Sequence, residues 1–122
     1  MSPRLELELE RGRYHPGDTV RGTIRVLEGS GSRGLDAVLE YREETEDYHE
    51  VVTEIPSGRL HEGDLAAGTS FEFELALPPD ALPNYRSEHG RLYWSIDVRS
   101  DERGRDTHVR RRVEVARAAR SS

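Results

Sequence analysis

FEFELALPP, residues 71–79, is the first half of the stretch that decides the fold, and LYWSIDV, residues 92–98, is the second half. In both segments apolar residues occupy every second position, which is the period of a strand with one buried and one solvated face. The prolines at 78 and 79 cannot donate to a sheet ladder, so the first strand must end before them. The stretch therefore predicts two strands joined by a long loop, with Trp94 buried against Phe71 and Phe73.

Strand-like patterns recur along the rest of the chain. Clean alternation predicts strands over 5–9, 20–26 and 35–41, and Val109, Val113 and Val115 predict a last strand over 109–115. Residues 48–55 are β-prone but carry apolar residues in both phases, which suits an edge strand, and Pro56 should end it. No window has the period of an amphipathic helix. The sequence therefore predicts an all-β fold, an immunoglobulin-like antiparallel β-sandwich of about seven or eight strands.

Composition limits the classes of function. The 122 residues suffice for one domain, and hydrophobic and charged residues make up 34% each, which fits a thin sandwich with two solvated faces. There is no Cys, so disulfides and thiolate zinc sites cannot form. The net charge of −6 argues against sequence-independent binding of nucleic acid. No apolar run approaches the ~20 residues that span a bilayer, and the N-terminus does not resemble a signal peptide.

These observations lead to an expected organisation. We expect one cytoplasmic domain over residues 1–116, without membrane insertion, followed by a disordered tail over 117–122.

In order along the chain, several segments resemble the N-terminal domain of the arrestin family, which includes bacterial and archaeal arrestin-like proteins of the sporulation-control type. The matching residues are Tyr14-x-Pro16-Gly17-Asp18-x-Val20-x-Gly22-x-Ile24, Leu60-x-x-Gly63, Phe71-x-Phe73-x-Leu75-x-Leu77-Pro78 and Leu92-x-Trp94-x-Ile96-x-Val98. Arrestins usually have Tyr at the position of Trp94. The resemblance implies an immunoglobulin-like sandwich that holds other proteins and has no catalytic activity.

The departures from the arrestin pattern concern phosphate recognition. Typical arrestins carry two such domains, and this chain has room for one. Arg110 lies roughly where receptor-binding arrestins have a phosphate-sensing Arg, but part of that residue's acidic partners come from the second domain. Phosphoreceptor recognition is therefore not implied, and we expect Arg110 to be solvated. The next residue, Arg111, falls in the apolar phase of the last strand, so either the alternation breaks there or an acidic partner meets it.

The predicted interaction surface is the edge strand with the acidic run before it. Alternation places Val51 and Ile55 on one side and Tyr48 and Val52 on the other, so part of this apolar surface is left for a partner. The neighbouring carboxylates favour a protein partner with basic residues, or a second copy of the chain. The candidate binding residues are Glu43, Glu44, Glu46, Asp47, Tyr48 and Val52.

Two alternative functions remain open, and neither predicts a resident cofactor. Two turns share the frame His-x-Gly-Asp, at 15–18 and 61–64, and would form a metal-dependent hydrolase site if they met in space. Exposed aromatic residues such as Tyr85 and Tyr93 would bind a sugar or small ligand if they lined one concave face. The motif Gly29-x-Gly31-x-x-Gly34 matches a dinucleotide fingerprint, but the strand predicted after it leaves no helix N-terminus for a pyrophosphate.

Overall fold

The computed structural model of the chain describes residues 2–104 and 106–117, which contain nine strands and no helix. The predicted tail, from residue 118 onward, lies outside the described residues. Seven strands have six or more residues and two are short. The strands are β1 (Arg4–Leu9), β2 (Arg13–Tyr14), β3 (Thr19–Glu28), β4 (Gly34–Thr45), β5 (His49–Glu62), β6 (Ser70–Ala76), β7 (Tyr85–Ser87), β8 (Gly90–Asp101) and β9 (Thr107–Val115).

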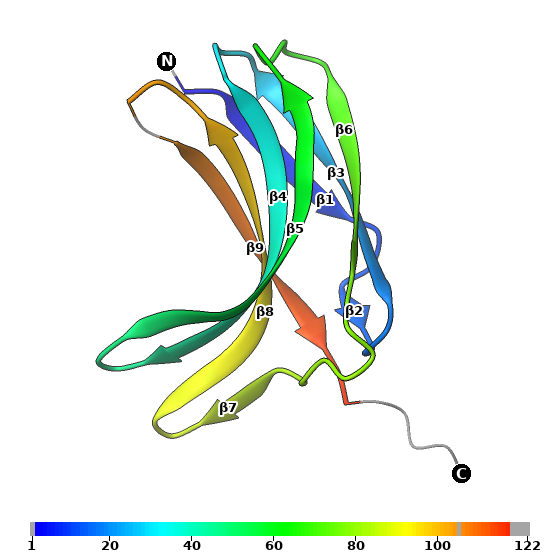
Figure 1. Ribbon diagram of the computed structural model, residues 1–122, viewed down its shortest axis with the longest axis vertical. Helices are drawn as coiled ribbons and strands as arrows, with labels where there is room; N and C mark the ends of the chain where they lie inside the picture. The colour runs from blue at the N-terminus through cyan, green and yellow to red at the C-terminus, as the bar shows by residue number, and fades with distance from the viewer. Residues whose placement is uncertain (1, 105, 118–122) are drawn as a thin grey trace.

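Two sheets pack face to face as a β-sandwich (Figure 1). One has three strands in the order β1-β3-β6, and the other has the order β2-β9-β8-β4-β5, with β7 paired to β8. All pairs are antiparallel except the short parallel pair β2–β9. The predicted all-β, antiparallel sandwich is confirmed. The two strands of the deciding stretch, β6 and β8, lie in different sheets and contribute one face each to the core.

The core is built from the alternating apolar residues. Trp94 is 2% exposed, as predicted, and its indole N–H donates to the carbonyl of Leu82 at 2.7 Å. Its ring contacts Tyr41, with ring centres 4.8 Å apart, whereas the ring of Phe73 lies against Gly22. A Cβ on Gly22 would stand 2.6 Å from that ring, so glycine is required by the close approach of Phe73.

Strand β5 extends beyond its predicted end. Pro56 lies inside the strand, so the prediction that it ends the strand is wrong. A proline is acceptable at this position for two reasons. Strand β5 is an edge strand, and the register of its pairing with β4 shifts next to Pro56. In this irregular region the backbone N–H of Ala37 donates to the side-chain oxygen of Ser57 at 3.0 Å. The β4–β5 ladder therefore continues across a residue that lacks a backbone donor.

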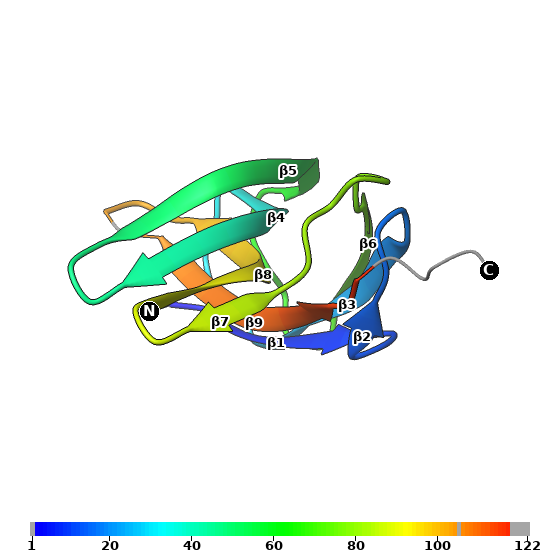
Figure 2. The ribbon, with the colours of Figure 1, turned by 90° about the horizontal axis from the view of Figure 1, so that it is seen from below.

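The six-stranded sheet curves strongly and extends past the three-stranded one (Figures 1 and 2). Its protruding part consists of the β4–β5 and β7–β8 hairpins, which lie side by side and are called the arm below. Because of the curvature, the face that points away from the core is concave. Among the described residues, no helix is long and apolar enough to cross a membrane.

Candidate functional site

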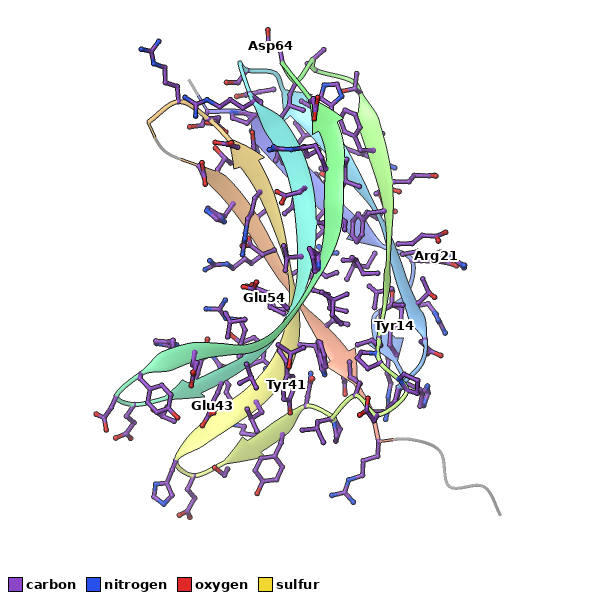
Figure 3. The ribbon with its side chains drawn as sticks, in the orientation of Figure 1. Tyr14, Arg21, Tyr41, Glu43, Glu54 and Asp64 are labelled. Carbon is purple, nitrogen blue, oxygen red and sulfur yellow. The ribbon has the colours of Figure 1, made fainter. Side chains whose placement is uncertain are left out.

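The six predicted binding residues cluster around the β4–β5 hairpin of the arm, but they do not share one face. Glu44 points to the concave face, where it meets β8. Glu43, next in the alternation, points to the opposite face, which the three-stranded sheet does not reach (Figure 3). The turn residues Glu46 and Asp47 are exposed, as are Tyr48 at 46% and Val52 at 53%. These placements leave the predicted binding role untested.

Glu44 is bound inside the molecule. Its carboxylate accepts two N–H groups of Arg91, at 2.6 and 2.7 Å, and a hydrogen bond from the hydroxyl of Tyr93. The hydrogen bond from Tyr93, followed by that of Arg91, lowers the pKa of Glu44 below its usual value. Burial and the same carboxylate raise the pKa of Tyr93. Glu44 therefore joins the two hairpins of the arm.

Glu43 and Tyr48 form a second, more exposed pair. The hydroxyl of Tyr48 donates to the Glu43 carboxylate at 2.9 Å, and this hydrogen bond raises the pKa of Tyr48. The pair holds an aromatic ring and a negative charge next to each other at the tip of the hairpin. Such a combination can contact a cationic side chain through the ring face and the carboxylate.

A β-bulge decides which way the apolar residues of β5 point. Tyr41 pairs with Thr53 but Arg42 pairs with Val51, so Val52 is the extra residue of the bulge. Val51 consequently faces the concave side, while Ile55 packs against the core. The prediction that these two residues face the same side is wrong, because the bulge reverses the alternation between them.

The concave face carries a buried charge network that the sequence did not indicate. Asp97 is 0% exposed and contacts Arg99 at 2.8 Å, His108 at 3.1 Å and Arg110 at 3.5 Å. Glu40 is 1% exposed and contacts Arg42 at 3.2 Å and Arg99 at 3.3 Å. Alternation placed these carboxylates on a solvated face. The curvature of the sheet and the long cationic side chains around them remove them from water instead.

The two arginines that the sequence left open have different surroundings. Arg110 is 54% exposed at its side chain, as expected, but it also has the buried Asp97 as an acidic partner. Arg111 pairs with Ile96 on β8 and is exposed. The apolar alternation of β9 is therefore broken at Arg111. This was one of the two possibilities that the sequence left open for this residue.

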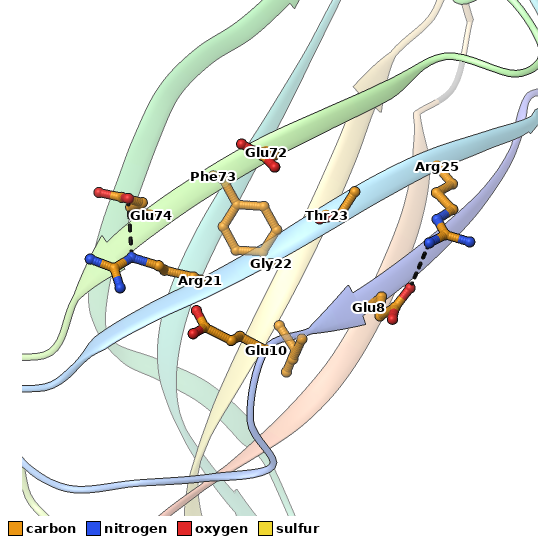
Figure 4. A pocket seen from close by; sticks show the side chains of 10 residues that line it. Glu8, Glu10, Arg21, Gly22, Thr23, Arg25, Glu72, Phe73 and Glu74 are labelled. Carbon is orange, nitrogen blue, oxygen red and sulfur yellow. Dashed lines mark hydrogen bonds and ion pairs between the residues drawn. The ribbon is translucent and has the colours of Figure 1, made fainter.

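The three-stranded sheet has its own hollow, of about 320 Å³, on its outer face (Figure 4). Thr23, Gly22 and Phe73 line it together with charged side chains of all three strands. Arg21 binds Glu74 and Arg25 binds Glu8, each at 3.1 Å, with both partners more than half exposed. These are ordinary cross-strand surface pairs, and they assign no chemistry to this face.

The two histidine turns lie at opposite ends of the sandwich. Asp18 precedes the first residue of β3, whereas the turn at 61–64 leads to Leu65, which pairs with Ser30 beyond the last residue of β3. Ten residues of strand separate the turns, about 33 Å. A site that uses both turns cannot form, and the described residues contain no group of three metal-ligating side chains.

Two further constellations fail on geometry. Tyr85 pairs with Leu92 and points away from the concave face, whereas Tyr93 lines it, so these rings do not form one sugar-binding platform. His108 binds Asp97 as in a catalytic dyad, but Ser95 pairs with Arg112, four residues further along β9. That separation is about 13 Å, too far for Ser95 to serve as the nucleophile.

Comparison with known proteins identifies the fold. No protein-family model and no curated protein matches the sequence. The structure of Spo0M, a sporulation control protein from Bacillus subtilis, matches with a TM-score of 0.67 at 20% identity, over 98% of this chain and 51% of that one. The β-glucosidase EmGH1 from Erythrobacter marinus matches with a TM-score of 0.34 at 15% identity, over 93% of this chain and 16% of that one, and supports no inference. The chain thus spans about half of Spo0M and shares its arrestin-like fold.

Proposed function

We propose that this chain is a non-catalytic protein-interaction domain, of regulatory or scaffold type, that holds a partner along the β5 edge. The observation that carries the proposal is the position of β5: it has 14 residues and pairs only with β4 among the described strands. At about 3.3 Å per residue the strand is about 46 Å long, and the seven residues before Pro56, which lacks an N–H, give an edge of about 23 Å of backbone donors and acceptors. An extended partner segment can add to such an edge as a further strand.

The side chains of the edge favour a basic partner. Val52 projects from the bulge and is exposed, so it supplies an apolar contact next to the free backbone. Glu50 and Glu54 on β5 are exposed, and Glu46 and Asp47 extend the negative charge into the turn. Glu44 contributes less to this charge, because Arg91 neutralises it. The proposed contact is therefore a β-strand pairing whose specificity comes from carboxylates.

The comparison and the geometry support a binding role over catalysis. Spo0M, named as a sporulation control protein, has this fold. The metal and tyrosine sites that would have indicated a hydrolase or a sugar-binding protein do not assemble. We place the domain in the cytoplasm, with a protein partner or a second copy of the chain on β5.

Two matched variants test this proposal. Val52→Lys puts a charge that repels basic segments on the edge, while Leu27→Lys places the same charge at an exposed residue of β3 in the other sheet. Partner capture from a lysate of the source organism and sedimentation velocity should show a complex for the parent and for Leu27→Lys, but not for Val52→Lys. Equal capture and equal self-association in all three proteins, with unchanged circular dichroism, would exclude β5 as the binding edge.

A further inference from the structure

A second hollow, of about 240 Å³, lies on the concave face and is distinct from the β5 edge. It is called the Ser95 hollow, after the small residue at its floor. Its walls come from β4, β8 and β9, which are neighbours in the six-stranded sheet. The lining residues are Arg42, Glu44, Arg91, Tyr93, Ser95, Arg110 and Arg112.

The floor of the hollow offers a free hydroxyl. Ser95 is 3% exposed and stands between Glu40 on β4 and Arg112 on β9, both much longer side chains. Because Ser95 is shorter than the Arg42, Tyr93 and Arg112 side chains that also line the hollow, it lies at the floor. No protein group in the described part of the chain hydrogen-bonds to the Ser95 hydroxyl. This hydroxyl is therefore available to a ligand, and a nearly buried hydroxyl gains from a partner.

The walls of the hollow carry excess positive charge. Arg91 is bound to Glu44, and Arg42 to Glu40, so these two cations are largely neutralised. Arg112 has no carboxylate within ion-pair distance among the described residues, and it lies over the ring of Tyr93 at 5.2 Å. Arg110 has one contact, at 3.5 Å, with Asp97. Arg112, with a contribution from Arg110, thus provides guanidinium N–H groups that no carboxylate occupies.

The cationic wall is also held in position. The guanidinium groups of Arg91 and Arg112 both contact the Tyr93 ring, each 5.2 Å from the ring centre. The Tyr93 hydroxyl is fixed by Glu44. Arg112 is therefore restrained before any ligand arrives, which reduces the entropy that binding must overcome.

We propose that the Ser95 hollow binds a small oxyanion, with the oxygens accepting from the Arg112 guanidinium and the Ser95 hydroxyl. The matching chemistry is a phosphate, sulfate or carboxylate group, because a planar guanidinium donates to two such oxygens at once. The volume suits one small anion or one anionic group of a larger molecule. The site is independent of partner binding at β5, so either proposal can fail without the other.

Titration calorimetry at low ionic strength tests the site with inorganic phosphate, sulfate and malonate as separate probes. The parent protein should bind at least one of them saturably at one site per chain. Saturation by phosphate and sulfate alone would indicate a tetrahedral anion, whereas saturation by malonate alone would indicate a carboxylate. In amide NMR spectra, the bound probe should shift Tyr93, Ser95 and Arg112.

Three variants locate the site. Arg112→Gln should weaken binding about ten-fold, as expected for a lost charge-assisted hydrogen bond, and Ser95→Ala about three-fold. Arg4→Gln removes the same charge from the other sheet, where Arg4 is exposed, and should leave the affinity within about two-fold. The proposal is overturned if no probe saturates, if Arg112→Gln binds like the parent, or if Arg4→Gln loses as much affinity as Arg112→Gln.

Discussion

The two outer faces of the sandwich carry the same kinds of ion-paired residue, but the carboxylates are exposed on one face and buried on the other. On the three-stranded sheet, Glu8 and Glu74 bind arginines while remaining 59% and 66% exposed at their side chains. On the concave face, Glu40 and Asp97 also bind arginines, but they are 2% and 0% exposed. Alternation of acidic and other residues along the strands is common to both faces. The difference comes from the shape of the sheet.

Curvature changes the energetics of an ion pair. On an open face, water solvates both charges, so each pair contributes little. On the concave face, the curvature brings the long side chains of neighbouring strands closer together. These side chains cover the carboxylates, which lose contact with water. A carboxylate in that position depends on its partners, because removal of one side of a buried pair leaves an uncompensated charge. The concave face should therefore be sensitive to mutation where the other face is tolerant.

The largest expected effect is the loss of Asp97. Asp97→Ala leaves Arg99, His108 and Arg110 clustered without their common carboxylate. We expect a loss of about 3 kcal/mol in the free energy of unfolding, near the lower end for a broken buried pair because the cations partly reach water. Glu74→Ala on the other face should cost less than about 1 kcal/mol. Urea denaturation measures both, and equal costs would refute the comparison.

A smaller effect concerns the coupling energy of single pairs. A double-mutant cycle on Arg99 and Glu40 should give about 1–2 kcal/mol, and the same cycle on Arg21 and Glu74 about 0.2–1 kcal/mol. Sodium chloride at 1 M should remove most of the second coupling and less of the first, because buried pairs are screened less. A first coupling that disappears equally in salt would show that the concave face is as open as the other.

The smallest effect is the pH dependence of the Glu44 contacts on the arm. The pKa of Glu44 is lowered in the folded state, first by the Tyr93 hydrogen bond, so its contribution to stability is present above the unfolded pKa of about 4.3. That contribution is lost as the pH falls through the lowered folded pKa. In an NMR titration of the side-chain carboxyl, Tyr93→Phe should raise the pKa of Glu44. Tyr85→Phe, which changes a hydroxyl elsewhere on the arm, should not. A parent Glu44 that titrates at the usual glutamate value would contradict the assignment.

Local pattern was sufficient to predict the larger elements of the fold. The apolar alternation of β1, β3, β6 and β8 is uninterrupted, so the strands, their buried sides and the core position of Trp94 followed from it. The short strands β2 and β7 were missed, because two or three residues cannot establish a period. The continuation of β5 through Pro56 was missed, because edge position and bulges depend on how strands pair with each other and not on the local sequence.

The site was less predictable than the fold for a related physical reason. The acidic residues of the hairpin could be named from the sequence. However, Glu43 and Glu44 are consecutive residues of a strand, so their side chains point to opposite faces of the sheet. The burial of Asp97 and Glu40 depends on the curvature of the whole sheet, and the Ser95 hollow depends on which long side chains flank a short one across three strands. Their only sequence signal is a strand interleaved with Ser95, Asp97 and Arg99, which equally fits a solvated face.

Amide hydrogen exchange of the chain, free and in complex with its captured partner, tests the proposed function most directly. If the partner adds a strand to the β5 edge, the backbone amides of residues 49–55 that face away from β4 should gain protection of at least about ten-fold. The amides of β1, which is also an edge strand, should keep their exchange rates. Protection of β1 or of the concave face, with the rates along β5 unchanged, would contradict the assignment of β5 as the binding edge.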